Sequence, residues 1–492
     1  MNMAVVIDEF QQFEEKYGYL VDEIDGFRYW AYIRFSLYMQ IEDVLNNQGR
    51  PSVNNYRPSI KEVFSIIKNL TIKNPLLYKQ HKQILFFTHA RRSLVGEKYE
   101  CIYTDRIRDE FPENSISGEF IFGTRHLEPA YTKNLLKLDV IDVWPAVVLK
   151  IFNGYFKKRD AALISQFNKI GEDISSKIYE VFSVNIAATT ITQMIIKRYY
   201  WHRMKKRLLT RLIVNISPSV IVEVVGYETN KLIVNEIAND LGIPTIELQH
   251  GVIGRGHLAY NYKVKRNYPF LPKYIFMFAQ YWKDECNFPI DDKNKIITGF
   301  PYMESQIKRY PILEKKINDP IVILVLSQPE FSKKLKGFIT DAIKLAAEKG
   351  LKVKFIYKLH PSEYRLSNKT WSCFEEYDNV SIVNNAAIPL YTLFAQADIQ
   401  VGVTSTAVFE GLAYKLKTFI YHIEKTETYM GNLVSHGEAK FVEDANELIK
   451  CISTFNRNEV WTDKNRSFFT ENALTNIKTE IERIMNKNER EH

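Results

Sequence analysis

The sequence predicts an α/β protein with two parallel-sheet domains and a helical region at its N-terminus. Three observations support this fold class. Short apolar runs alternate with helical patterns from residue 84 onward, a second series of the same kind begins near residue 321, and residues 1–80 show mainly helical spacing. Such alternation is typical of βαβ units and a parallel sheet. A chain of 492 residues also exceeds one ordinary core, since this length usually forms about two or three domains.

The first 80 residues are expected to form a helical lead-in or cap. Between Phe27 and Ile41, the apolar residues Trp30, Ile33 and Leu37 recur at helical spacing. Prolines punctuate the segment that follows.

The first series of apolar runs predicts an N-terminal Rossmann-like domain over residues 81–305, with a long helical insert at about residues 150–215. Five strands are expected in it: Ile84–Thr88, Phe120–Phe122, Val220–Val225, Thr245–Leu248 and Tyr274–Phe278.

The second series predicts a C-terminal Rossmann-like domain over residues 306–465, followed by a C-terminal helix over 466–492. Its expected strands are Ile321–Leu326, Val353–Tyr357, Val380–Val383, Ile399–Val403 and Thr418–Tyr421, with crossover helices at Lys334–Lys349 and Thr406–Ala413. Two such series predict two domains that face each other across a cleft. We expect the hinge at about residues 299–320, where glycine and prolines break the pattern.

Composition excludes several classes of protein. The chain is 46% hydrophobic and 25% charged, no window reaches the roughly 20 apolar residues of a membrane span, and the acidic N-terminus is unlike a signal peptide. We therefore expect a cytoplasmic location. Four scattered cysteines lack the spacing of a structural zinc site or a disulfide framework. The net charge of +8 favours an anionic partner, and no nucleic-acid-binding motif accompanies it.

The most informative motif is the stretch from Gly402 to Gly411. An apolar run ends in Thr404, Ser405 and Thr406, where a helix is expected to begin. Such a junction leaves backbone N–H groups free beside hydroxyl groups, which is a site for an anion such as phosphate. Glu410 is out of register for a capping box and is a candidate acceptor for a ribose diol. The simpler alternative is that the hydroxyls cap the helix and Glu410 complements its dipole.

A second motif, Lys358-Leu359-His360-Pro361, follows another expected strand. Lys358 and His360 alternate along the chain, so both are expected on one side, where they suit a diphosphate. The alternative is an ordinary turn at the strand end. Ser327 and Gln328, after the first strand of the same domain, are expected to reach the nucleotide.

A third motif, Gln249-His250-Gly251, closes a strand of the N-terminal domain. His250 can take a proton from an acceptor hydroxyl at neutral pH, and the loop that carries His257 and Tyr260 can close over a ligand. Glu228, after another strand, is the competing base. Structural roles remain open for both: a hydrogen-bonded histidine at the domain interface, and an acid at a helix start.

The loop after the first expected strand, His89–Ser93, points to the same cleft by topology. Farther along, residues 197–211 interleave lysine and arginine with aromatic and apolar residues. A basic amphipathic helix of this kind can lie on anionic lipid, although the apolar stripe of such a helix more commonly joins the core.

Together the motifs resemble the bacterial surface-polysaccharide glycosyltransferases of GT-B type, which act on capsule and lipopolysaccharide, and the related CDP-glycerol glycerophosphotransferases. Those families carry a His-Gly motif, an Arg-x-His-Pro motif and a Ser-Ser or Ser-Thr phosphate motif. Here these correspond to His250-Gly251, Lys358-x-His360-Pro361 and Ser405-Thr406, within residues 220–425. The resemblance implies a GT-B-like fold, His250 as base, and donor phosphates held by His360, Ser405 and Thr406.

The resemblance also implies two partners, a nucleotide-sugar donor and a glycan or lipid-linked glycan acceptor. The positive net charge and the basic helix add the anionic inner face of the plasma membrane as a further candidate partner. No metal and no cofactor is expected. Lys358 replaces the usual arginine and so loses a bidentate fork. The acidic motif of bacterial sialyltransferases is not evident. Alternatives are a polyol-phosphate transferase, a non-catalytic scaffold, and a relative of the UDP-N-acetylglucosamine 2-epimerases, whose Ser-Gly-Gly loop is here Ser-Thr-Ala.

Overall fold

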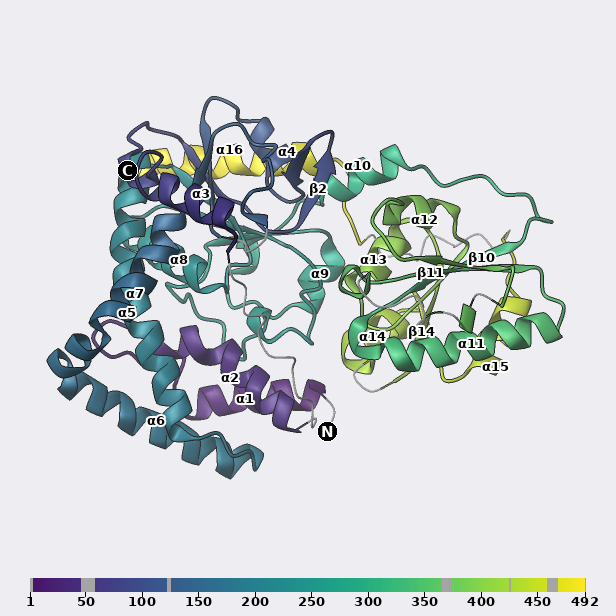
Figure 1. Ribbon diagram of the computed structural model, residues 1–492, viewed down its shortest axis with the longest axis horizontal. Helices are drawn as coiled ribbons and strands as arrows, with labels where there is room; N and C mark the ends of the chain where they lie inside the picture. Colours follow the sequence, from purple (N-terminus) through teal and green to yellow (C-terminus); the bar gives the residue numbers. More distant parts are fainter. Residues whose placement is uncertain are drawn as a thin grey trace.

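Two parallel β-sheets, each covered by helices, form the framework of the protein, and Figure 1 shows them in separate halves of the molecule. The structure is a computed structural model that describes residues 3–45, 58–121, 125–364, 371, 373, 374, 376–423, 426–457 and 468–491. The predicted fold class is confirmed: two Rossmann-like α/β domains with a helical region at the N-terminus.

The N-terminal sheet has seven strands in the order β5-β4-β1-β6-β7-β8-β9, all parallel. Their bounds are β1 Ile84–Phe87, β4 Ser115–Glu119, β5 Leu135–Lys137, β6 Val220–Val224, β7 Thr245–Leu248, β8 Tyr274–Met277 and β9 Lys295–Ile297. The central strands are buried on both faces, as continuous apolar runs predict for a parallel sheet. Strand order reverses between β1 and β6, and such a switch point opens a crevice at the carboxyl ends.

The C-terminal sheet has six parallel strands in the order β12-β11-β10-β13-β14-β15. Their bounds are β10 Ile321–Leu326, β11 Val353–Lys358, β12 Val380–Val383, β13 Ile399–Gly402, β14 Lys417–Tyr421 and β15 Lys440–Val442. The helices of this half are α11 Ser332–Glu348, α12 Leu390–Gln396, α13 Thr406–Ala413, α14 Thr426–Ser435 and α15 Ala445–Ser453. Here the order reverses between β10 and β13, which places the predicted phosphate loop at a switch point.

Helices at the N-terminus and in the insert pack together on one side of the first domain (Figure 1). They are α1 Met3–Lys16, α2 Tyr29–Leu45, α3 Ile60–Leu70, α5 Asp139–Arg159, α6 Ala161–Phe182 and α7 Ala188–Ile216. Tyr199 and Tyr200 of α7 are buried, so much of the aromatic stripe of the basic helix faces the core. The buried tyrosines therefore do not support binding of this basic helix to a lipid surface.

The remaining helices of the first domain are α4 Asp105–Asp109, α8 Thr229–Asp240, α9 Gln280–Glu285 and α10 Pro301–Arg309. The last helix, α16 Ala473–Glu491, returns from the C-terminal sheet to this domain and lies along its edge, drawn yellow in Figure 1. Trp282 donates a hydrogen bond to the Phe468 carbonyl oxygen at 2.9 Å, which fixes the chain as it enters this path.

One predicted strand was wrong. The strand here is β4, which ends at Glu119, directly before Phe120; Phe120 and Ile121 are not in a strand, and Phe122 lies outside the described residues. The sequence of β4 is Ser-Ile-Ser-Gly-Glu, which has a single large apolar residue and no strand-like pattern. Strands β5, β9 and β15, of three residues each, and the antiparallel hairpin of β2 Arg92–Val95 and β3 Lys98–Cys101 were not predicted.

Candidate functional site

The predicted phosphate loop joins β13 to α13 and has its own capping arrangement. Ser405 is the N-cap residue, and its hydroxyl accepts a hydrogen bond from the Ala407 N–H at 3.2 Å. The Thr404 N–H donates to Gln328 Oε1 at 3.1 Å. Within the part of the chain that the structure describes, the backbone N–H groups of Ser405 and Thr406 have no hydrogen-bond acceptor. Two adjacent free donors at a helix start are what an anion requires.

Gln328 ties the two sides of the switch point together. Its amide Nε2 donates to the Thr404 hydroxyl at 2.8 Å, so the loop after β10 fixes the loop after β13. Contact of Gln328 with the nucleotide stays a prediction; in the structure its amide holds the phosphate loop. Ser327, next to it, is buried, and its N–H donates to the Lys358 carbonyl oxygen at 2.9 Å.

The His-Gly motif of the N-terminal domain lies opposite this loop. A Cβ atom built on Gly251 would be 3.8 Å from the Thr406 hydroxyl oxygen, so the two predicted motifs meet at the junction of the domains. Tyr103 donates a hydrogen bond to the His250 carbonyl oxygen at 2.5 Å, which fixes the backbone at this point.

A chain of hydrogen bonds runs from His250 into the N-terminal sheet. The Tyr260 hydroxyl lies 2.9 Å from His250 Nδ1 and 2.5 Å from Glu247 Oε1. When Glu247 is ionised, it accepts a hydrogen bond from the Tyr260 hydroxyl, and the Tyr260 oxygen in turn accepts a hydrogen bond from the N–H at His250 Nδ1. His250 Nε2 then carries the lone pair, which is the tautomer that a general base requires.

Burial shapes the charges around this chain. Desolvation lowers the pKa of His250 to about 3, helped by the nearby His257, His89 and Arg91, so the imidazole is neutral near pH 7. Desolvation likewise raises the pKa of Glu247 to about 7. Its neighbour Glu223 lies at the paired position on β6, and burial together with the charge of Glu247 raises the pKa of Glu223 to about 8.

The loop after β6 leaves no room for a side chain at Gly226, next to the carboxylates of Glu247 and Glu223. A Cβ atom at Gly226 would lie 2.5 Å from Glu247 Oε2, and the Gly226 N–H donates to Glu247 Oε1 at 3.0 Å. Glycine is therefore required there for the carboxylate to occupy its position.

Glu410, predicted to bind a ribose, is occupied by protein donors. Arg91, from the loop after β1, donates to Glu410 Oε1 at 3.0 Å, and Tyr391 of α12 donates to Oε2 at 2.8 Å. Glu410 is buried and belongs to the C-terminal domain, whereas Arg91 belongs to the N-terminal domain. This ion pair therefore links the domains beside the phosphate loop, and a ribose would compete for the same oxygens.

Lys358 and His360 differ in their surroundings. The Lys358 ammonium is buried, donates to the Asn385 carbonyl oxygen at 2.9 Å and contacts the Tyr364 hydroxyl; burial lowers the pKa of Lys358 to about 8. His360 is exposed, and its ring Nδ1 lies 2.8 Å from the Ser362 hydroxyl. Partial burial lowers the pKa of His360.

Glu228, the competing base, belongs to a different environment. Its carboxylate pairs with Lys231 at 3.3 Å and lines a cavity bounded by α5 and α7.

Throughout the described residues, no group of three or more histidine, cysteine, aspartate or glutamate side chains is arranged to hold a metal ion. The four cysteines are free thiols, and Cys101 and Cys286 are buried.

The sequence reasoning missed Glu223 and Glu247 as parts of the site. Each is a single acid inside an otherwise apolar strand, and an acid at such a position is the signal that could have drawn attention to them.

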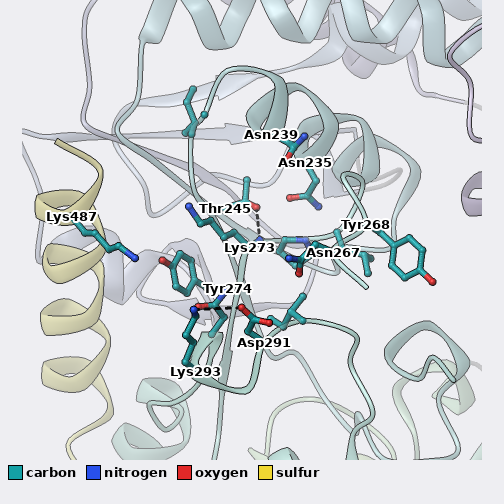
Figure 2. Close-up of a pocket in the computed structure, with 16 residues that line it drawn as sticks. Asn235, Asn239, Thr245, Asn267, Tyr268, Lys273, Tyr274, Asp291, Lys293 and Lys487 are labelled. Carbon is teal, nitrogen blue, oxygen red and sulfur yellow. Dashed lines mark hydrogen bonds and ion pairs between the residues drawn. The ribbon is translucent and has the colours of Figure 1, made fainter. Parts of the chain in front are cut away.

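A polar pocket of about 320 Å³ lies elsewhere on the N-terminal domain (Figure 2). It is lined by Thr245 and Tyr274, the first residues of β7 and β8, and by Lys487 of α16. Ligands of open parallel sheets bind at the opposite, carboxyl ends of the strands, so we assign no substrate to this pocket.

No protein-family model matches the chain, and no curated protein sequence matches it. Solved structures with a similar fold include a putative UDP-N-acetylglucosamine 2-epimerase from Listeria monocytogenes, at 9% identity and a TM-score of 0.48 over 82% of this chain and 97% of that one. A UDP-GlcNAc 2-epimerase from Methanocaldococcus jannaschii is 13% identical, with a TM-score of 0.45 over 81% and 98% of the two chains. MurG from Acinetobacter baumannii is 11% identical, with a TM-score of 0.42 over 83% and 99%.

Proposed function

We propose that this protein is a glycosyltransferase that moves a sugar from a nucleotide-activated donor to a growing surface glycan of the capsule or lipopolysaccharide type. One observation carries the proposal: two backbone N–H groups, at Ser405 and Thr406, have no acceptor among the described residues and lie opposite the loop of Gly251 and His250. An anion site and a neutral imidazole on facing domains are the two elements that nucleotide-sugar transfer requires.

In this mechanism the C-terminal domain holds the donor. The N–H groups of Ser405 and Thr406, together with the positive end of α13, bind the phosphates, and Lys358 and His360, at and after the end of β11, are the further candidate contacts. As the glycosidic bond of the donor breaks, these groups stabilise the charge of the leaving phosphate electrostatically. Such stabilisation makes a divalent metal unnecessary in the proposed reaction.

The N-terminal domain presents the acceptor. His250 Nε2 takes the proton of the acceptor hydroxyl as that oxygen attacks the sugar, and the resulting imidazolium is stabilised through Tyr260 by the Glu247 carboxylate. The low pKa of His250 keeps the ring unprotonated before the acceptor arrives.

Thermal shifts with CMP, CDP, UMP, UDP, GDP and ADP test the donor site, because a ligand that binds only the folded state raises the midpoint. Thr406 is the first helical residue and Ser405 before it has φ −71° and ψ 140°, so Thr406→Pro is compatible with the backbone and removes one N–H group. We expect Thr406→Pro to lose the shift and the matched variant Thr406→Ala, which keeps the N–H, to retain most of it.

The catalytic assignment has a separate test. His250→Ala is expected to keep the nucleotide shift and lose transfer, whereas His81→Ala, at an exposed histidine, should keep both. Several results would redirect the proposal. Conversion of the donor without an acceptor would favour an epimerase, and transfer from a CDP-polyol would favour a polyol-phosphate transferase. The absence of a shift with every nucleotide would favour a non-catalytic module.

A further inference from the structure

Helix α5 presents an apolar face to solvent. Trp144, Val147, Ile151, Phe152 and Tyr155 recur at helical spacing, and their exposed fractions run from 42% for Val147 to 66% for Ile151. Five large apolar side chains on one exposed helix face exceed the isolated apolar residues that any surface carries. A partner that covers this face must therefore be apolar where it touches α5.

Basic charges predominate along this face. Residues 143–159 contain Lys150, Lys157, Lys158 and Arg159 and no acidic residue, and Arg159 pairs at 2.6 Å with Asp160, the residue that follows the helix. Helix α3, which contacts α5, repeats the pattern, since Ile60, Phe64 and Ile67 are exposed and the charged residues exposed on it are lysines. An apolar face bordered by lysine and arginine is complementary to the surface of an anionic bilayer.

A cavity of about 630 Å³ opens beside this face. Val147 and Lys150 of α5 line one side, Arg198 and Trp201 of α7 line another, and Phe120 follows the carboxyl end of β4. The cavity thus combines an apolar wall with cations at the edge of the sheet where α/β proteins bind their ligands.

Two of these cations lack a carboxylate partner among the residues that the structure describes. Arg198 donates to the Thr229 hydroxyl at 2.8 Å and pairs with no described acid, and burial lowers its pKa. Lys150 has no described ion pair. The acids of the cavity are already used, because Asp142 pairs with Lys205 at 2.6 Å and Glu228 pairs with Lys231. A half-buried guanidinium without a described acid beside it is a site that an incoming anion stabilises.

The cavity and the proposed acceptor site share the loop that follows β6. Glu228 lines the cavity, and the preceding residue, Tyr227, lies 6.0 Å from His250 between ring centroids.

We propose that this cavity binds the phosphate of an anionic lipid, with Arg198 and Lys150 as its contacts, while the apolar face of α5 enters the bilayer. This inference extends the proposed function, since it assigns the acceptor to the class of phosphate-bearing amphiphiles. Its test measures lipid binding and needs neither a nucleotide nor turnover.

Flotation of the full chain with vesicles tests the phosphate contact. We expect binding to phosphatidylcholine vesicles that contain phosphatidic acid and little binding to phosphatidylcholine alone. Arg198→Gln should weaken binding about five-fold or more, since one such charge near an anionic membrane is worth about this factor. Arg207→Gln removes the same charge from an exposed position of the same helix and should change binding less than two-fold.

The apolar contact has its own pair of variants. Ile151→Ser with Phe152→Ser should reduce flotation at least as strongly as Arg198→Gln, whereas Leu313→Ser with Ile317→Ser, at positions of similar exposure between the domains, should leave it unchanged. Equal loss in both pairs, or equal loss with Arg198→Gln and Arg207→Gln, would overturn the proposal. Binding of soluble glycerol phosphate as tight as the binding of the vesicles would also overturn it, because α5 would then contribute nothing to the affinity. A nucleotide shift that persists without lipid binding would separate this failure from that of the proposed function.

Discussion

Glu247 shows how one side chain in the sheet controls the tautomer of a histidine in the site. Among the described residues, Gly226 and Tyr260 donate hydrogen bonds to its carboxylate, both to the same oxygen, and Tyr260 also contacts His250. Below pH 7 the carboxyl is protonated in the folded protein, because burial raises the pKa of Glu247 to about 7. It can then donate to Tyr260, which donates to His250 Nδ1 and leaves the proton on Nε2.

We therefore predict that kcat/KM for transfer rises with pH through about 7 and then levels off. Protonation of His250 does not produce this limb, since its pKa is lowered to about 3. Glu247→Gln should abolish the limb and lower the plateau by about 10²-fold, the size of a general-base contribution. Glu113→Gln, at an exposed position, is the control. An unchanged limb near pH 7 in Glu247→Gln would contradict the relay.

At the scale of single residues, the sequence predicted those features that depend only on neighbouring residues in the chain. Ser405 caps a helix directly after an apolar strand, and both features are adjacent in the chain. Glu410 was predicted from the same motif, but its partner Arg91 lies 319 residues away, and no local pattern reveals such a pairing. The acid pair of Glu223 and Glu247 likewise depends on the register of two strands.

Helices α6 and α7 pack closely because a glycine lies between them. A Cβ atom at Gly171 would lie 2.1 Å from Thr192 Oγ1 and 2.9 Å from the Ala188 carbonyl oxygen. We predict that Gly171→Ala lowers the free energy of unfolding by about 1–3 kcal/mol, the usual cost of overpacking. Gly154→Ala, in α5 with open space around it, should raise it by about 0.5–1 kcal/mol. Chemical denaturation measures both, and similar effects of the two substitutions would contradict this packing.

Strands were predicted where burial on both faces leaves an apolar run, as in β1, β6 and β10. The prediction failed at β4, whose Gly118 makes room for neighbours instead of filling space: a Cβ there would lie 3.0 Å from Leu138 and 3.4 Å from Phe87. The hydrophobic pattern of a segment reflects its own apolar side chains and not the size of the residues that pack against it, so a small residue such as Gly118 gives no signal for a strand. Strands of three residues, such as β5, are too short for any pattern.

At the scale of the whole molecule, two features join the halves. The ion pair of Arg91 and Glu410 links them at the site, and the segment from Phe468 onward returns from the second domain to the first. A C-terminal helix was predicted, whereas its place on the N-terminal domain depends on contacts between residues that lie 178 to 368 positions apart in the chain. Gly299, with φ +91°, also meets this segment, since a Cβ there would lie 2.2 Å from the Thr470 carbonyl oxygen.

This return predicts that a substitution near the C-terminus destabilises the N-terminal domain. Ile481 of α16 is fully buried, and α16 contacts α4, α10 and β6. Ile481→Ala should lower the stability of that domain by about 2–4 kcal/mol, the cost of a cavity in a core. Hydrogen exchange should therefore quicken in peptides of α4, α10 and β6 and stay unchanged in β10 and β13. Lys478→Ala, which removes only the exposed pair with Glu110 at 3.1 Å, should cost less than about 1 kcal/mol. Faster exchange in the C-terminal sheet would instead assign α16 to the domain that precedes it in sequence.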